Sequence, residues 1–191
     1  MKVLRWILIN LLIIVSGCDV FSPRDAENPE QPAAWHTFQV TPAKTLENLV
    51  YAYNYRENVY NYTNLFFDTF YFYFDNQDAS DFSIPSYWTK SSEIDMLMNT
   101  WQRINPGSSM ELTLTPIPSQ GDNIQTNRAW FFRTYQLTIA HSLTDIPTLF
   151  TGKFQIYMEK DNNGFWKIKE WYDYRLTSSW TWGRMKNEFS L

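Results

Sequence analysis

The chain has 191 residues, 44% of them hydrophobic and 18% aromatic, so one compact domain with a sizeable core is expected. Its formal net charge is −4 and it has no run of Lys and Arg, which excludes the basic patch that nucleic-acid binding requires. Because Cys18 is the only cysteine, no disulfide can form within the chain, and packing alone must stabilise the fold.

The first 17 residues have the three-part layout of an export signal. A short basic start precedes an apolar run from Trp6 to Val15, and the small residues Ser16 and Gly17 follow. The run is too short to cross the roughly 30 Å apolar layer of a bilayer as a helix. We therefore expect residues 1–17 to be a cleaved signal peptide.

The sequence Val15-Ser16-Gly17-Cys18 resembles the lipobox of bacterial lipoproteins. In that family the cysteine is acylated, for example with palmitate, and becomes the new N-terminus. The resemblance therefore implies lipid attachment at Cys18, where each buried methylene adds about 0.8 kcal/mol to membrane binding. The alternative is a plain signal peptide with an incidental cysteine, although an unpaired thiol has no other obvious use in an exported protein.

A lipidated Cys18 implies a protein of the bacterial cell envelope, with the membrane as its partner through the N-terminal lipid. Cleavage removes Lys2 and Arg5, which leaves 14 Lys plus Arg against 20 Asp plus Glu and a net charge of −6. The outer membrane facing the periplasm is preferred over the inner membrane. Asp19 is an inner-membrane retention signal in some bacteria, but that rule does not hold across phyla.

Residues 19–34 contain three prolines and show no hydrophobic periodicity, which is typical of a tether. We therefore expect three parts in the chain: the signal peptide 1–17, a lipidated N-terminus with a flexible tether at 18–41, and a folded domain at 42–191.

Three helices are expected in the first half of this domain. Thr41-Pro42 is typical of a helix start, because a hydroxyl residue caps the helix and proline suits the first turn. A short second helix is expected over 58–66. A third helix follows Ser92, whose spacing to Asp95 resembles a capping box, and ends at Asn105-Pro106-Gly107. The apolar residues at helical spacing in the first and third helices are Leu46, Leu49, Val50, Tyr53, Ile94, Leu97, Met98, Trp101 and Ile104.

Strands are expected elsewhere. Residues 67–75, FDTFYFYFD, carry aromatic side chains on both faces, which predicts a strand with something packed against each side. Four more strands are expected to begin near Met110, Ala129, Thr148 and Gly164. The last two should form a hairpin, because the Asn and Gly residues between Asp161 and Gly164 tolerate the positive φ of a tight turn.

This order of elements resembles the NTF2-like fold, a cone in which a curved sheet wraps around helices. Residues 46–74 look like its opening helices and first strand, and residues 150–173 look like its closing hairpin. Gly164-Phe165-Trp166-Lys167-Ile168 matches the usual glycine-x-tryptophan-x-isoleucine signature. The resemblance covers roughly residues 42 to 177 and implies an α+β cone with a curved, mostly antiparallel sheet around N-terminal helices. Residues 179–189, SWTWGRMKNEF, also look like the ending of uncharacterised bacterial lipoproteins with this domain.

Some members of the superfamily are enzymes, such as ketosteroid isomerase, but their catalytic residues do not carry over well. The first-helix tyrosine of the isomerase falls near Leu49, and only Asp75 could stand for its general base. The sequence contains no phosphate loop, dinucleotide fingerprint or nucleophile elbow, so no cofactor is expected. His36 and His141 are too few for a zinc site. We therefore expect no catalytic residues.

Strand alternation nevertheless identifies weak catalytic candidates. Asp68, Arg133, His141 and Glu170 share the parity of the apolar residues around them, so they would point into the cone. If they cluster there, they form an ion network or an acid–base site. The alternative is that they lie at strand ends or beside solvent. A single β-bulge would also exchange the faces of all later residues in a strand.

By the same alternation, several aromatic residues would lie on the opposite, outer face of the sheet, where they would form a ligand or partner surface. Sheets of this fold commonly dimerise through their outer face, so the resemblance implies a homodimer or an envelope protein partner. A sugar ring could also stack there. The alternative is that Trp180 and Trp182 of the chain's own C-terminus cover the surface. The residues expected on this face are Tyr71, Tyr73, Trp130, Phe132, Tyr157 and Trp171, whereas Trp166, Ile168, Tyr172 and Tyr174 are expected to pack inward.

Three functions remain open from the sequence. The first is a lipid-anchored envelope protein whose NTF2-like domain binds a partner or an unknown small ligand without catalysis. The second is an isomerase, dehydratase or hydrolase that acts on a small molecule inside the cone. The third is a structural subunit of an envelope assembly.

Overall fold

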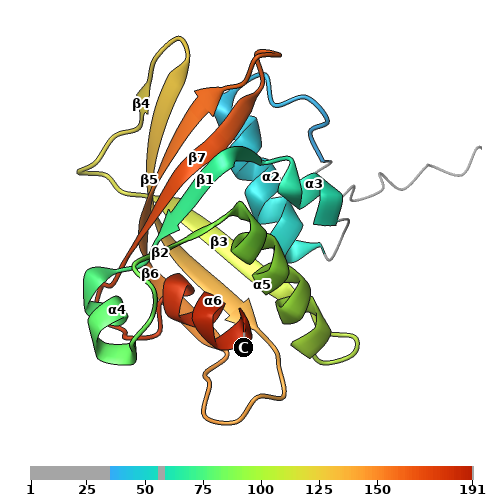
Figure 1. Ribbon diagram of the computed structural model, residues 1–191, viewed down its shortest axis with the longest axis vertical. Coiled ribbons are helices and arrows are strands. Elements are labelled where there is room, and N and C mark those ends of the chain that lie inside the picture. The colour runs from blue at the N-terminus through green and yellow to red at the C-terminus, as the bar shows by residue number, and fades with distance from the viewer. Residues whose placement is uncertain (1–34, 56–58, 191) are drawn as a thin grey trace, which may run out of the picture. The chain divides into compact units, whose positions relative to one another are not determined.

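A computed structural model of the protein describes residues 35–55 and 59–190. The expected signal peptide, Cys18 and the proline-rich residues 19–34 lie outside this part. The described chain is an α+β fold with one mixed sheet in the order β2-β1-β7-β6-β5-β3, and β4 pairs with β5 (Figure 1). The strands are β1 (Phe66–Tyr73), β2 (Tyr87–Thr89), β3 (Met110–Pro116), β4 (Asn123–Ile124), β5 (Arg128–Ile139), β6 (Leu149–Lys160) and β7 (Trp166–Tyr174).

The sheet is antiparallel except where β1 runs parallel to β7. The predicted hairpin between β6 and β7 is confirmed. Gly164 has φ +81°, as the tight turn requires, and the Asp161 carboxylate accepts hydrogen bonds from the backbone N–H groups of Asn163 and Phe165 at 2.9 and 3.0 Å. The pairing of β6 and β7 could therefore be predicted from the residues of the turn alone.

A β-bulge interrupts β7. Ile168 pairs with Met158 and Glu170 with Tyr157, so Lys169 is an extra residue with no partner on β6. Because side chains alternate along a strand, this insertion exchanges the faces of the residues that follow it. Trp171 is therefore buried rather than exposed. The expected outward position of Trp171 and the expected inward positions of Tyr172 and Tyr174 are wrong.

The first helix begins where its sequence signals predict, although the Thr41 hydroxyl makes no capping hydrogen bond, and the third helix does not begin at its predicted residue. α2 begins at Pro42 after Thr41 and buries the expected Leu46 and Leu49. α5 begins at Lys90, two residues before the proposed capping box at Ser92, so that box does not form. Two helices have no counterpart in the expected set, α4 and α6. The helices are α2 (Pro42–Asn54), α3 (Val59–Thr63), α4 (Asn76–Phe82), α5 (Lys90–Arg103) and α6 (Trp182–Ser190).

The segment before α2 packs against the domain. The His36 N–H donates to Asn48 Oδ1 at 2.8 Å, and the Gln39 carbonyl accepts from the Trp166 N–H at 2.9 Å. Gln39 is only 6% exposed. Residues 35–41, assigned to the tether from sequence, are therefore held by α2 and β7.

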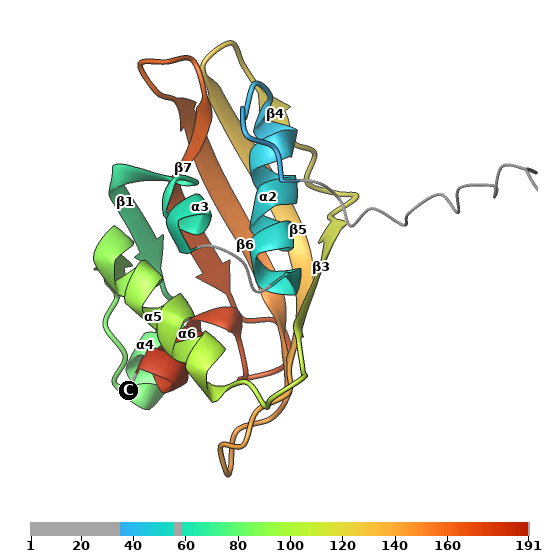
Figure 2. The ribbon, with the colours of Figure 1, turned by 90° about the vertical axis from the view of Figure 1, so that its right-hand side faces the viewer.

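Figure 2 shows α2, α3, α5 and α6 on the same face of the sheet. One hydrophobic core lies between these helices and the strands. None of the helices that the structure describes lies over the opposite face (Figures 1 and 2). The two faces therefore have different roles: one holds the core, and the other is open to solvent.

Candidate functional site

The space between the helices and the sheet is occupied by the chain's own C-terminus. α6 packs against α5 and the sheet, and four of its side chains have no exposed surface (Figure 2). Trp182 lies edge-on to Trp171, with ring centroids 4.5 Å apart, and donates its Nε1–H to the Tyr53 hydroxyl at 3.0 Å. The alternative that Trp182 covers the outer face is wrong. The buried side chains of α6 are Trp182, Met185, Lys186 and Phe189.

The N-terminus of α6 is held by side-chain acceptors. The first two N–H groups, of Trp182 and Gly183, donate to the Tyr135 hydroxyl and to Asp173 Oδ2, both at 2.7 Å. The next, of Arg184, donates to Thr181 Oγ1 at 3.0 Å. A helix start leaves such groups without intrahelical partners, so these contacts fix the position of α6. The carboxylate also suits the positive end of the helix dipole.

Lys186 is buried in a mostly aromatic environment. Its ammonium lies 2.5 Å from Glu93 Oε1, and neither side chain has exposed surface. The same nitrogen lies 3.8 Å from the ring centroid of Phe72 and 4.0 Å from that of Trp171. Burial lowers the pKa of Lys186 to about 8, although the Glu93 carboxylate opposes the shift. Glu93 also accepts hydrogen bonds from the Tyr62 hydroxyl at 2.5 Å and from Trp88 Nε1 at 3.0 Å.

Asp173 is the second buried acid on the inner side of the sheet. Burial raises the pKa of Asp173 to about 7, while the hydrogen bonds from Gly183 N–H and the Tyr135 hydroxyl act in the opposite direction. The Tyr135 hydroxyl donates to Asp173 Oδ1 at 2.8 Å. Burial also raises the pKa of Tyr135 well above its usual value. This pair has the chemistry of an acid–base site, but both groups hold the start of α6.

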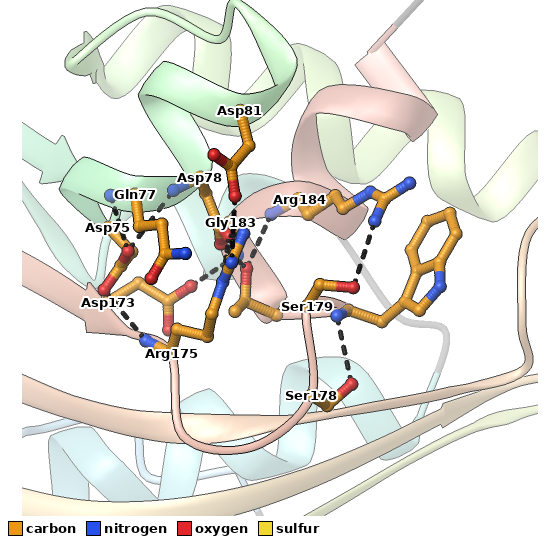
Figure 3. Close-up of polar contacts among 12 residues, drawn as sticks. Asp75, Gln77, Asp78, Asp81, Asp173, Arg175, Ser178, Ser179, Gly183 and Arg184 are labelled. Carbon is orange, nitrogen blue, oxygen red and sulfur yellow. Dashed lines mark hydrogen bonds and ion pairs between the residues drawn. The ribbon is translucent and has the colours of Figure 1, made fainter.

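A further polar cluster joins α4 to the end of β7. Figure 3 shows Asp75, Asp78 and Asp81 of this region directed toward Arg175. The guanidinium pairs with the fully buried Asp78 and with Asp81 at 3.0 Å. Thr181, just before α6, donates to the other oxygen of Asp78 at 2.5 Å. The cluster therefore ties α4, β7 and the start of α6 together.

Two of the weak catalytic candidates lie away from the inner side of the sheet. Asp68 is fully exposed and pairs with Lys90 at 2.9 Å, because β1 is irregular between Phe66 and Tyr71. Glu170 lies after the bulge of β7 and accepts a hydrogen bond from the Tyr172 hydroxyl at 2.8 Å. Their expected inward positions are wrong.

The other two candidates, Arg133 and His141, lie on the expected side but contact different partners. Arg133 is buried and forms two hydrogen bonds to the Asp122 carboxylate, at 2.6 and 2.7 Å. His141 is half-buried after β5, with Nε2 3.1 Å from the Pro147 carbonyl oxygen, and its ring packs against Phe189. Because each of the four residues is engaged with a different partner, they do not form one site.

Leu49 and Asp75, the two positions compared with the ketosteroid isomerase site, also have structural contacts within this domain. Leu49 is fully buried in the core. Asp75 caps α4, since its carboxylate accepts from the N–H groups of Gln77 and Arg175 at 2.8 and 3.0 Å. Neither residue is available to act on a bound molecule in the way that the isomerase comparison would require.

The uncovered face of the sheet carries aromatic residues in register across several strands. Tyr87, Tyr73 and Tyr172 are partners on β2, β1 and β7, and the rings of Tyr73 and Tyr172 stack with centroids 4.5 Å apart. Trp130 and Tyr157 stack at 5.0 Å between β5 and β6. We call this surface the outer aromatic face; it consists of Tyr71, Tyr73, Tyr87, Trp130, Tyr157 and Tyr172. Of the six residues expected there, Tyr71, Tyr73, Trp130 and Tyr157 belong to it, and Phe132 shares the side of β5 that carries Trp130. Trp171 is buried and does not belong to it.

The buried residues Glu93, Asp173 and Lys186 were not identified from the sequence. Glu93 resembled a surface residue of a helix start, and Lys186 lies in a segment without expected structure. The regular spacing of Trp182, Met185, Lys186 and Phe189 is the signal that could have identified α6 as a buried helix.

The described residues offer neither a metal-ligand cluster nor a membrane-spanning helix. In residues 35–55 and 59–190, no three His, Cys, Asp or Glu side chains come together where they could hold a metal ion. No helix in that part of the chain has the length and apolar character needed to cross a membrane.

Comparisons with known proteins give the fold but no activity. No protein-family model and no curated protein matches the chain. Solved structures do match. A conserved protein from Planctomyces limnophilus has 11% identity and a TM-score of 0.55, and the match covers 68% of this chain and 89% of the other. An NTF2-like protein of unknown function from Shewanella oneidensis has 14% identity and a TM-score of 0.51, over 70% and 95% of the two chains.

A third structure, an NTF2-like superfamily protein from Salmonella enterica, has 15% identity and a TM-score of 0.52, over 71% and 89% of the two chains. At these identities the likeness shows the fold alone. The described domain has an NTF2-like fold, as the sequence predicted. In this chain the C-terminal helix α6 occupies the inner side of the sheet.

Proposed function

We propose that this protein is a lipid-anchored protein of the bacterial cell envelope whose NTF2-like domain binds a protein partner without catalysis. One observation carries the proposal: the inner side of the sheet is filled by α6, whereas the outer aromatic face has no described helix over it. An exposed aromatic surface of this kind is typical of protein association. A second copy of the chain is the partner that we propose.

The lipid anchor is supported by the order of basic start, apolar run, small residues and Cys18 in the sequence. Growth of the producing cells with labelled palmitate should label the wild-type protein and leave Cys18→Ala unlabelled and uncleaved. Ser16→Ala, which keeps a small residue before the cysteine, is the matched control and should remain labelled. Label retained in Cys18→Ala would refute the anchor.

Association through the outer aromatic face can be tested by sedimentation of the full-length protein in detergent. Replacing Tyr73 and Tyr172 together with Ser should shift the protein from dimer to monomer, because it removes two stacked aromatic rings from the face. Tyr55→Ser, which changes a tyrosine that is 39% exposed at the end of α2, should leave the dimer intact. A wild-type monomer would contradict self-association, and a fixed, different partner would favour the structural-subunit alternative.

Catalysis inside the cone is the second candidate, favoured by the pairing of Asp173, whose pKa is near 7, with Tyr135. A substrate could reach this pair only if α6 moved, because the N–H groups of Trp182 and Gly183 bind the same two side chains. For that reason we favour the binding function.

A further inference from the structure

A cavity of about 370 Å³ lies outside the buried contacts of α6, where the segment before α2, the helix α3 and the start of β7 meet. It is bordered by residues 35–39, by residues 60–64 in and after α3, and by the start of β7 at Phe165 and Lys167. We call it the edge pocket. Its volume lies near the lower end of the range of small-molecule sites, about 300–1,000 Å³.

The walls of the edge pocket are fixed by hydrogen bonds. His36 is bound twice by the Asn48 amide, which accepts from its N–H at 2.8 Å and donates to its carbonyl oxygen at 2.9 Å. The other wall is tied to β7, since the Ile168 N–H donates to the Leu65 carbonyl oxygen at 2.7 Å. A ligand would therefore meet a largely preformed site and would not have to order its walls.

Three segments distant in sequence each contribute an aromatic ring to the pocket: Trp35, Tyr60 and Phe165. Two of these rings are held by packing from behind. Trp35 lies edge-on to Tyr51 at 5.9 Å, and Phe165 packs on Phe38 at 5.5 Å. The pocket thus offers aromatic surface that is already positioned for a flat apolar group.

Most of the described polar side chains that line the edge pocket carry no charge. The side chains of Thr37, Asn61 and Asn64 make no hydrogen bond to the part of the chain that the structure describes. Gln39 uses its amide nitrogen on the His36 carbonyl at 2.7 Å, which leaves its amide oxygen as an acceptor. Among the lining residues that the structure describes, Lys167 is the one charged group, and it is paired with Asp161 at 3.3 Å.

We propose that the edge pocket binds a neutral saccharide unit. A pyranose ring has a face of C–H groups, which suits the negative face of an aromatic ring, and a rim of hydroxyl groups, which suits amides that both donate and accept. A phosphorylated ligand would require an unpaired cation, and a purely apolar ligand would leave the amides without partners. The proposal does not depend on lipid attachment or on dimerisation.

The full-length protein can be titrated with the methyl glycosides of glucose, galactose, mannose and N-acetylglucosamine. Saturation-transfer NMR and tryptophan fluorescence should show saturable binding of at least one of them. Sorbitol, which has hydroxyl groups but no ring, should bind at least tenfold more weakly. Absence of saturable binding for all four glycosides overturns the proposal.

Variants then locate the site. Trp35→Ala, and separately the double variant Asn61→Ala/Asn64→Ala, should each weaken binding of the same glycoside at least tenfold. Met98→Ala, which changes a side chain on α5 that is 42% exposed and lies outside both the edge pocket and the outer aromatic face, is the control and should bind as wild type. If Trp35→Ala does not fold, the double variant decides, because Asn61 and Asn64 are only half-buried and hold no neighbouring group. Unchanged affinity in the double variant overturns the assignment to this pocket.

Discussion

Lys186 and Glu93 form an ion pair that is completely buried between α6 and α5, with the ammonium 2.5 Å from the carboxylate. The rings of Phe72 and Trp171 lie against the same ammonium. A buried pair contributes little net stability when both partners are present, but removing one partner leaves an uncompensated charge. The pair therefore makes the docking of α6 specific for a cation at position 186.

Lys186→Met should lower the free energy of unfolding by about 3–5 kcal/mol, because Glu93 would remain buried without its partner. The double variant Lys186→Met/Glu93→Gln should recover part of this loss. Urea denaturation followed by tryptophan fluorescence measures both. A double variant no more stable than Lys186→Met would show that the loss does not arise from the unpaired charge of Glu93.

The same site predicts a chemical rescue. Lys186→Ala removes the atoms of a propylammonium group, and n-propylammonium chloride should raise the melting temperature of this variant in a saturable way. n-Propanol, of similar size but uncharged, should do so more weakly, since only the ammonium can pair with Glu93. Wild type serves as the control and should not respond. Equal effects of the amine and the alcohol would contradict recognition of the charge.

Asp173 should make the protein less stable as the pH rises from about 4 to about 7. Its pKa is raised from 3.8 to about 7, so in this window the folded state keeps a proton that the unfolded chain has lost. The free energy of unfolding then falls with rising pH. Asp173→Asn cannot titrate, and it should remove this decline.

The readout is the difference between the pH–stability curves of wild type and Asp173→Asn, measured by urea denaturation. The difference is needed because Glu159 and Asp161, whose pKa values are lowered, add a stability loss of their own at acid pH. Parallel curves for the two proteins would rule out a titration of Asp173 in this window.

Gly183→Ala should be strongly destabilising, by about 1–3 kcal/mol, because the helix start has no room for a methyl group. A Cβ at this position would lie 2.9 Å from Asp173 Oδ2 and 3.0 Å from Phe74 Cδ1. Gly121→Ala is a suitable control, since a Cβ there meets nothing within 4 Å. Thermal denaturation distinguishes the two, and equal melting temperatures would argue against the close approach.

Arg175→Met should loosen α4. Asp78 would keep its bond from Thr181 but lose its ionic partner while remaining fully buried. Hydrogen exchange of the amides in Asn76–Phe82 should accelerate at least tenfold, whereas exchange in β6 should not change. Arg128→Met removes the exposed pair with Glu159 and serves as the control. Unchanged exchange in α4 would show that Arg175 does not hold it.

The fold could be predicted where local chemistry decides it. Pro42 and the turn from Asp161 to Gly164 act within a few residues, so the start of the first helix and the closing hairpin follow from their sequence. The extra residue Lys169 carries no comparable local signal, because its neighbours alternate as in a regular strand. Everything that was placed by parity beyond it, including Trp171 and Glu170, was therefore assigned to the wrong face.

The candidate site was harder to predict, because it depends on contacts between distant residues. Lys186 and Glu93 are 93 positions apart, and neither lies in an apolar run that would indicate burial. Charged residues are rarely buried unless they are paired, and a pairing over such a distance cannot be read from one sequence. The aromatic residues of β1 and β5 were placed correctly, since alternation holds along most of those strands.

The hydrogen bond between Gln39 and Trp166 also has a mechanical consequence. Tension applied to the chain at Trp35 would act on the His36 contacts to Asn48 of α2, and then on the Gln39 hydrogen bond to β7, before it reached the start of α2 at Pro42. Because Gln39 is bonded to β7, which lies between β1 and β6, the load would pass into the interior of the sheet rather than unwind a helix from its end. Tension at this end of the domain would thus be shared between the middle of α2 and the interior of the sheet.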